Sequence, residues 1–252
     1  MIKELRHRII LDQVNTQHTV NVEELSDLLK VSTATIRRDL IDLEVKGSVN
    51  RVHGGATVKH SAPEPFVLAR SGLQRDAKRR IGKAAAGMVK DGETIIISTG
   101  TTTEAMIPFL ADKTDLTVIT NALNIAYRLT QFEHINTIVL GGLLRTREYD
   151  MQGHISESSL SDLVATRLFR GVYGIHPRHG LTASDLLMVR TDQRMIKMTQ
   201  ELVIVADHTK ICRVGSVQLA PVTAAAVIIT DTDAPEEEVE RLRKLGVNIM
   251  LV

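Results

Sequence analysis

The sequence predicts an α/β protein in two parts: a small N-terminal domain of helices and a β-hairpin, and a larger domain built on a mostly parallel sheet. Capped helices with one apolar face, followed by a short alternating segment, predict the first part. Apolar strands that alternate with helices predict the second. The expected domains are residues 1–58 and 76–252, with residues 59–75 as a connector containing Pro63, Pro65 and Gly72.

The composition is that of a folded globular chain. Apolar residues make up 43% and charged residues 24% of the 252 residues, which is enough chain for two cores. Cys212 is the single cysteine, so no internal disulfide or thiol-rich zinc site is possible, and we expect no metal and no cofactor. No stretch resembles a signal segment or is apolar for long enough to span a bilayer, so we place the protein in the cytoplasm and expect no membrane partner.

Three helices are expected first. The apolar stripe of the first helix is Ile2, Leu5, Ile9 and Val14, and that of the second is Val22, Leu25, Leu28 and Leu29. Asn21 with Glu24 forms a capping-box-like start for the second helix. Ser32 caps a third helix, whose core positions are Ile36, Leu40 and Leu43 and which ends at Gly47. Residues 49–58 alternate and contain Gly54-Gly55, which favours a hairpin or wing. The domain is therefore a winged helix-turn-helix.

In the larger domain, predicted strands alternate with predicted helices, which is typical of a parallel sheet. Expected strands are 94–98, 116–120, 137–140, 169–173, 202–206, 225–230 and 247–252, and expected helices are 78–89, after Gly100, from Ala122, 158–166, 187–199 and from Pro235. Pro235 followed by three glutamates is typical of a helix N-terminus, because proline is tolerated there and acids favour the positive end of the dipole.

The third helix carries a candidate reading face. If Ile36 and Leu40 face inward, then Arg37 and Arg38 face outward at about 100° per residue. An arginine side chain can bond O6 and N7 of guanine, and a threonine can contact phosphate or a thymine methyl group. The candidate residues for binding double-stranded DNA, including those of the wing, are Ser32, Thr33, Ala34, Thr35, Arg37, Arg38, Arg51, His53 and Gly54.

Other interpretations of this domain compete. The net charge is +1, and the first 57 residues contain as many acids as lysines and arginines, so bulk charge does not indicate a nucleic acid. An isolated pair of arginines is more often a solvated helix face, here partly paired with Asp39 or Asp42. A protein-interaction module is a further alternative, but exposed Arg37 and Arg38 argue against it. Aromatic residues make up only 3%, which argues against single-stranded nucleic acid. The capped helices and the wing together favour duplex DNA.

Particular motifs carry a resemblance to a known family. Ser32-x-x-Thr35-Ile36-Arg37-Arg38-Asp39-Leu40, then Leu43-Glu44, Gly47 and Arg51-Val52-His53-Gly54-Gly55-Ala56, resembles the N-terminal signature of the DeoR family of sugar-metabolism regulators. This resemblance implies a DNA-binding transcriptional regulator that represses genes of carbohydrate metabolism.

Polar or glycine-rich turns follow neighbouring strands of the larger domain. Gly100 with three threonines comes directly after one strand and opens a helix, which makes an anion site from backbone N–H groups. Open α/β sheets bind ligands at this carboxyl edge. Arg145, Arg147 and Lys210 are candidates to neutralise a phosphate, and Asp207 to accept sugar hydroxyls. The candidate residues for a small-molecule effector are Ser98, Gly100, Thr101, Thr102, Thr103, Thr120, Asn121, Gly141, Gly142, Arg145, Arg147, Gly153, Asp207 and Lys210.

The resemblance extends over the larger domain through the order of these motifs, from Gly100-Thr101-Thr102-Thr103 to Gly180-Leu181-Thr182 and Ala206-Asp207-x-x-Lys210. It implies a sensor fold similar to ribose-phosphate isomerases and CoA transferases, a phosphorylated sugar or related anionic metabolite as effector, and assembly as a homodimer or homotetramer. Three positions depart from the family pattern: Ser98 stands where an aspartate is common, His208 precedes Lys210, and His176 lies in a segment that is often acidic or small. These departures leave the identity of the effector open.

An enzyme is the competing function, because the sensor's apparent relatives include isomerases. Isomerisation of a sugar phosphate needs a carboxylate base near the sugar, and Ser98 removes the best-placed candidate. Asp207 and Lys210 remain as weak alternatives. We therefore expect a regulator without catalytic residues.

Overall fold

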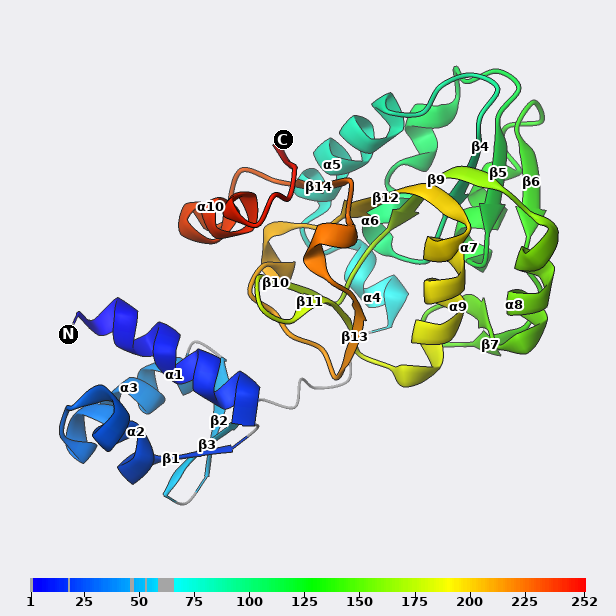
Figure 1. Cartoon of the computed structure of the whole chain (residues 1–252). Coiled ribbons are helices and arrows are strands. Elements are labelled where there is room, and N and C mark those ends of the chain that lie inside the picture. Colours follow the sequence, from blue (N-terminus) through cyan, green and yellow to red (C-terminus); the bar gives the residue numbers. More distant parts are fainter. Residues whose placement is uncertain (1, 18, 46–47, 53, 59–65) are drawn as a thin grey trace. The chain divides into compact units, whose positions relative to one another are not determined.

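The computed structural model describes residues 2–17, 19–45, 48–52, 54–58 and 66–252, which are drawn in colour in Figure 1. The chain divides into two compact units, Met1–Glu64 and Pro65–Val252. Among the described residues, none of the helices is both long enough and apolar enough to cross a bilayer.

The smaller unit consists of helices packed on a short antiparallel sheet. Its elements are α1 (Lys3–Gln17), β1 (Thr19–Asn21), α2 (Val22–Leu29), α3 (Thr33–Val45), β2 (Val49–Val52) and β3 (Gly55–Val58), with the strands in the order β1-β3-β2. Asn21 caps α2 as expected, since its side-chain oxygen accepts the N–H of Glu23 at 2.9 Å. A three-residue strand such as β1 is too short to show periodicity, and the sequence did not predict it.

The core of this unit confirms most of the expected apolar stripes. Ile36, Leu40 and Leu43 of α3 are at most 2% exposed. The expected stripe of α1 is wrong at its start, because Ile2 is 73% and Leu5 is 39% exposed. The buried residues of α1 are instead His7, Ile10 and Val14, which recur at helical spacing on another face. Leu28 of α2 also faces outward, at 53% exposed.

A seven-stranded parallel sheet organises the larger unit, in the order β15-β14-β12-β9-β4-β5-β6. The strands are β4 (Thr94–Ile97), β5 (Thr117–Thr120), β6 (Asn136–Val139), β9 (Ala165–Arg170), β12 (Thr199–Val205), β14 (Val227–Thr230) and β15 (Ile249–Leu251). Most of this order can be followed from left to right in Figure 1. The chain adds strands outward from β4 to β6, and then returns to place β9 on the other side of β4. Such a reversal opens a crevice beyond the carboxyl ends of the two central strands.

Helices cover both faces of the sheet. They are α4 (Val67–Ser71), α5 (Arg75–Gly87), α6 (Thr101–Glu104), α7 (Leu123–Leu129), α8 (His154–Ser159), α9 (Leu186–Lys197) and α10 (Glu236–Lys244), with 3₁₀ turns η1 (Ile107–Leu110), η2 (Leu160–Asp162), η3 (His208–Lys210) and η4 (Val222–Ala224). Ile95 and Ile97 of β4 pack in one buried cluster with α5 and α7, while Ile96 packs in the opposite cluster with α9 and α10. This alternation is the reason for the continuous apolar runs in the strands.

Two small antiparallel sheets lie beside the main one, and the sequence predicted neither. One is the hairpin of β7 (Leu143–Arg145) and β8 (Asp150–Gln152). The other consists of β10 (Gly174–His176), β11 (Gly180–Ala183) and β13 (Val217–Ala220). Their strands are three or four residues long, so alternation could not be recognised in the sequence.

The helix expected over residues 158–166 is wrong, because the chain forms α8 and η2 there and enters β9 at Ala165. The sequence did not predict the start of β9 because charged residues interrupt its apolar pattern. In the structure Arg167 forms ion pairs with Glu93 and Glu201 of neighbouring chain segments. Within the expected connector 59–75, residues 67–71 form α4 and α5 begins at Arg75.

Candidate nucleic-acid interface and ligand site

The third helix presents two arginines to the surface of the smaller unit. Ser32 caps α3, since its Oγ accepts the N–H of Thr35 at 3.2 Å and lies 2.9 Å from the Thr35 hydroxyl. Arg37 and Arg38 are exposed, on the side of α3 away from Ile36 and the core. Neither guanidinium forms an ion pair within the parts of the chain that the structure describes. Both arginines are therefore accessible to a ligand.

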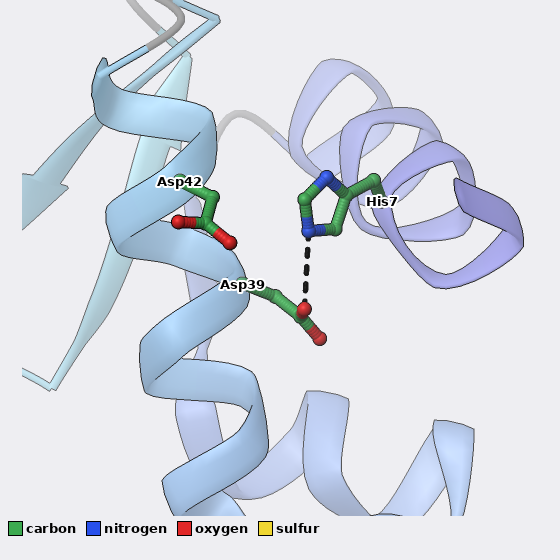
Figure 2. Close-up of side chains that lie close together, drawn as sticks. All are labelled: His7, Asp39 and Asp42. Atoms are coloured by element: carbon green, nitrogen blue, oxygen red, sulfur yellow. Dashed lines mark hydrogen bonds and ion pairs between the residues drawn. The ribbon is translucent and has the colours of Figure 1, made fainter. Parts of the chain in front are cut away.

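Asp39, the acid that follows these arginines, points inward. Its carboxylate accepts hydrogen bonds from Arg6 of α1, from Nε at 2.7 Å and from Nη2 at 3.0 Å, and lies 3.0 Å from Nε2 of His7. Figure 2 shows His7 reaching from α1 toward this carboxylate on α3. Asp39 is 2% exposed and Arg6 is partly buried, so loss of Arg6 would leave a buried carboxylate with fewer partners and would destabilise this unit.

Asp42, one turn further along α3, pairs with Lys3 of α1 at 2.7 Å. This ion pair raises the pKa of Lys3 through the hydrogen bond to Asp42. Cations of α1 thus neutralise Asp39 and Asp42 of α3, and the alternative in which Asp39 or Asp42 pairs with the arginines is wrong for the described contacts. His7, Asp39 and Asp42 offer three possible metal ligands within 4.8 Å, but Arg6 and Lys3 already neutralise both carboxylates.

The wing residues are placed unequally. Gly54 occupies an exposed turn with φ of +82°, which favours glycine. Arg51 is exposed and its Nη1 lies 3.6 Å from Glu44, a surface ion pair of the kind that contributes little to stability. A Cβ on Gly55 would lie 1.9 Å from the Val20 carbonyl oxygen, so this glycine is needed where β3 meets β1. His53 lies outside the described residues.

In the larger unit, the predicted polar turns meet at the carboxyl edge of the sheet. Ser98 and Asn121 follow β4 and β5 and are fully buried, with Ser98 Oγ 3.4 Å from Asn121 Oδ1. Thr120 Oγ1 donates to the Ile97 carbonyl at 2.7 Å, which ties the two strand ends together. Gly100 has a φ of +150°, and a Cβ there would lie 3.9 Å from Gly171 Cα, so the turns after β4 and β9 approach each other closely.

Two buried ion pairs lie at this edge, on the α9 side of the sheet. Arg170 of β9 pairs with Asp192 of α9, and their side chains are 3% and 0% exposed. Arg145 binds Asp150 through Nε at 2.9 Å and Nη2 at 2.7 Å. Burial raises the pKa of Asp192 to about 6, against the attraction of Arg170 and with a contribution from the negative charge of Asp150.

A basic pocket of about 310 Å³ lies on the α5 side of the sheet. Its lining residues come from α4 to α7 and are Ser71, Arg75, Lys78, Arg79, Thr101, Glu104, Ala105, Pro108, Phe109 and Arg128. Four of these are cations and one is an acid, and the acid, Glu104, is paired with Arg128. The side of the pocket formed by α5 keeps an excess of positive charge.

The remaining predicted residues are dispersed. Arg147 is exposed and its guanidinium stacks 4.7 Å from the Phe66 ring. Asp207 caps η3 by accepting the Thr209 N–H at 3.1 Å, and Lys210 lies 5.9 Å from the Tyr173 ring. Gly153 donates its N–H to Thr191 at 3.2 Å. Thr102 and Thr103 are buried, whereas Gly141 is exposed beside Gly142, whose φ is +151°.

Both histidines that depart from the family pattern have hydrogen-bond partners: His208 bonds Asp231, which follows β14, and His176 bonds residues of its own turn. His208 Nδ1 lies 2.7 Å from Asp231 Oδ2, and its backbone N–H donates to the same carboxylate at 2.7 Å. His176 Nδ1 accepts the backbone N–H of Arg178 at 3.1 Å and of His179 at 3.2 Å. These histidines hold turns together.

Sequence reasoning missed the charged and polar residues that the structure adds to the site. They are Arg75, Lys78, Arg79 and Arg128 around the pocket, and Asp150, Gln152, Arg170 and Asp192 at the opposite face of the edge. One signal was available: an arginine within the apolar run Leu168-Phe169-Arg170 is unusual for a buried strand. The partner Asp192 comes from α9, and nothing in the sequence joins the two.

A short helix joins the pocket to the hairpin. The N–H of Val67 in α4 donates to the Arg147 carbonyl at 3.0 Å, and Arg70 forms an ion pair with Glu148. Lys78 Nζ donates to the Arg70 carbonyl at 2.6 Å, so α4 is bonded both to the hairpin loop and to a pocket residue. The Glu148 carbonyl accepts the Thr99 hydroxyl at 3.1 Å, directly after β4.

The exposure of the two arginines leads to a prediction. Replacing Arg37 or Arg38 by alanine should weaken binding to a DNA duplex that the wild-type chain selects from a random library. One bidentate contact to guanine is worth about 1 to 3 kcal/mol, or roughly 5- to 150-fold in the dissociation constant. The melting temperature should not change, because both side chains are exposed. Fluorescence anisotropy measures the affinity, with Arg243→Ala of the larger unit as the control. If neither Arg37→Ala nor Arg38→Ala changed the affinity for the duplex, α3 would not carry the reading face.

The raised pKa of Asp192 predicts a dependence of stability on pH. Between its usual value of 3.8 and about 6, the folded chain holds a proton on Asp192 that the unfolded chain has released. The contribution of Asp192 to stability must therefore fall as the pH rises from about 4 to about 6. Asp192→Asn cannot titrate, so the free energy of unfolding of the wild type minus that of the variant should fall over this window. Urea titrations at several pH values test it, and a constant or rising difference contradicts it.

Comparison with known proteins agrees with these two units. A model of the DeoR-like helix-turn-helix domain matches residues 6–62, and a model of the DeoR C-terminal sensor domain matches residues 73–232. The chain is 32% identical over 250 residues to the putative aga operon transcriptional repressor of Escherichia coli O157:H7, covering 98% of this chain and 93% of that protein. It is 33% identical over 233 residues to the glycerol-3-phosphate regulon repressor of Escherichia coli K12, covering 91% of each chain.

Among solved structures, ribose 5-phosphate isomerase A from Methanocaldococcus jannaschii overlaps 54% of each chain with a TM-score of 0.40 and 18% identity. An overlap of this size carries no conclusion about activity. The named relatives are transcriptional regulators, which confirms the regulator over the enzyme. The chain therefore belongs to the DeoR family of DNA-binding transcriptional repressors, with a helix-turn-helix domain followed by a sensor domain.

Proposed function

We propose that this repressor controls genes of carbohydrate metabolism and that a phosphorylated sugar or a related anionic metabolite controls its hold on DNA. The observation that carries the effector class is the basic pocket next to Thr101, at the end of β4. The names of two relatives, an aga operon repressor and a glycerol-3-phosphate regulon repressor, support the same chemistry. We place the protein in the cytoplasm, where such a repressor meets its operator.

The charge of the pocket favours a phosphate group over a neutral ligand. Arg75 and Arg79 lie one turn apart on α5, with Lys78 between them, and Thr101 adds a hydroxyl group. Glu104 does not offset these cations, because Arg128 and Asn124 already bind it. Charge-assisted hydrogen bonds from arginine to phosphate are roughly twice as strong as neutral ones. A volume of about 310 Å³ suits a small metabolite.

Helix α4 is the proposed link between effector and DNA binding. It is the first described element after the smaller unit, and it contacts Lys78 on one side and the hairpin loop at Arg147 and Glu148 on the other. A ligand changes the population of two arrangements only if it binds one of them better. An anion in the pocket attracts Lys78 and competes with its hydrogen bond to the Arg70 carbonyl. Binding of the anion therefore weakens one of the contacts that keep α4 in place.

Assembly follows from the reading helix. A helix-turn-helix protein that reads two half-sites about 34 to 36 Å apart needs paired recognition helices. We therefore propose a homodimer or homotetramer that binds a nearly palindromic operator.

Binding of anions tests the pocket. Isothermal titration with ribose 5-phosphate, glycerol 3-phosphate and inorganic phosphate should show binding to the wild type. The double variant Arg75→Ala/Arg79→Ala should bind at least about 10-fold more weakly, because two charge-assisted contacts are removed. Arg80→Ala is the matched control, since Arg80 is on the same helix but does not line the pocket and its Nε bonds the Val252 carbonyl. Equal affinities in the double variant and the control would exclude this pocket.

The role of α4 is tested by Glu148→Gln, which removes the ion pair with Arg70. Thermal shift should show that the variant still binds the anion, because Glu148 does not line the pocket. The change in affinity for the selected DNA duplex on adding the anion should be reduced, because the link between hairpin and α4 is broken. Glu240→Gln, which removes a surface pair with Arg243, is the control. A normal DNA response in Glu148→Gln would show that α4 is not the link.

A further inference from the structure

The buried pair of Arg170 and Asp192 has polar atoms without partners. Arg170 Nε, Asp192 Oδ1 and Gln152 Oε1 are covered by protein, and no described residue offers any of them a hydrogen bond. A buried polar atom that lacks a partner costs about 1 to 3 kcal/mol, and more if it is charged. These three atoms therefore weaken the fold where they lie.

The three atoms belong to one cluster. Gln152 Nε2 donates to Asp150 at 2.8 Å, and Asp150 is near enough to Asp192 for its negative charge to act on that carboxyl. Helix α9 packs against β8, where Gly153 donates to Thr191, the neighbour of Asp192. Arg170 Nη1 lies 3.4 Å from Ser98 Oγ, which places the cluster at the reversal point of the sheet.

Stability does not explain the pair of Arg170 and Asp192. The adjacent pair of Arg145 and Asp150 is well satisfied, since both carboxylate oxygens accept hydrogen bonds from the guanidinium. A buried ion pair with unmet hydrogen bonds is less favourable than apolar residues of similar size. A ligand that supplies the missing hydrogen bonds would explain why these charged residues are present at this position.

We propose that Arg170 and Asp192, with Gln152, are specificity-determining residues that bind the hydroxyl groups of a polyhydroxylated effector; this inference rests on the proposed anionic effector. The cluster lacks an acceptor for Nε–H and donors for two oxygens, and a hydroxyl group supplies both. The phosphate remains at the basic pocket on the other face of the sheet edge, and the sugar carbons lie across the edge.

This assignment connects specificity with the response to effector. All three atoms are covered in this conformation, so a ligand reaches them only when β8 or α9 shifts. The hairpin that ends in β8 also carries Arg147 and Glu148, which hold α4. Recognition of the correct hydroxyl pattern thus moves the loop that anchors α4.

The double variant Arg170→Met/Asp192→Leu separates a ligand-binding role from a structural one. It replaces the pair by apolar side chains of similar size, and its melting temperature should equal or exceed that of the wild type. If the double variant folds, a fall of more than about 5 °C in its melting temperature would assign the pair to structure and overturn the proposal. Asp192→Asn provides a second, milder variant if the double variant does not fold.

Binding supplies the second measurement, with ribose 5-phosphate, glycerol 3-phosphate and inorganic phosphate as probes. The wild type should bind one of the two sugar or polyol phosphates more tightly than inorganic phosphate. Arg170→Met/Asp192→Leu, or Asp192→Asn in its place, should lose that preference by about 10-fold and keep its affinity for inorganic phosphate. Arg167→Met/Glu201→Leu, a pair on β9 and β12 at the other end of the sheet, should keep the preference.

The outcomes separate the two proposals. A wild type that binds none of the three anions contradicts the proposed function and this inference with it. A wild type that binds all three equally, or a variant that keeps the wild-type preference, overturns this inference alone.

Discussion

The order of the strands is the constraint on which the sensor site depends. Because the chain reverses direction of growth at β4, the ends of β4 and β9 lie together and the segments that follow them leave on opposite sides of the sheet. Gly100 and Gly171 are neighbours at this point, since a Cβ on Gly100 would lie 3.9 Å from Gly171 Cα. The basic pocket on the α5 face and the buried ion pairs on the α9 face are both consequences of this reversal.

The smaller unit has a positive surface although its acidic and basic residues balance in number. Lys3 and Arg6 of α1 neutralise Asp42 and Asp39 of α3, and Arg37 and Arg38 are left exposed. Bulk charge is thus a poor guide to DNA binding in this chain, because the sorting of charges between two helices sets the local field.

Polar contacts at the edge of the sheet also form a continuous series. Thr99 contacts the Glu148 carbonyl, Glu148 pairs with Arg70, and the Arg70 carbonyl accepts a hydrogen bond from Lys78 of the pocket. In the proposed function, a ligand at the edge acts on these bonds, which hold α4, the described element of the larger unit nearest in sequence to the helix-turn-helix unit. Charged residues with unmet hydrogen bonds, such as Arg170 and Asp192, are suited to such a site, because a ligand can form the hydrogen bonds that the folded chain leaves unmade.

The sequence by itself determined the fold class, the capped helix α3 with its exposed arginines and the turns at the strand ends. These features are local: Ser32 caps its own helix, Ile36 and Leu40 define one face of it, and Gly100 follows its own strand. The tertiary structure alone decided which charges are neutralised and which stay free. The pairs of Asp39 with Arg6 and of Asp192 with Arg170 join residues 33 and 22 positions apart, and no local pattern encodes such partners. The strands of the small sheets are too short to show alternation, and the start of β9 within residues 158–166 was missed because the ion-paired Arg167 interrupts its apolar pattern.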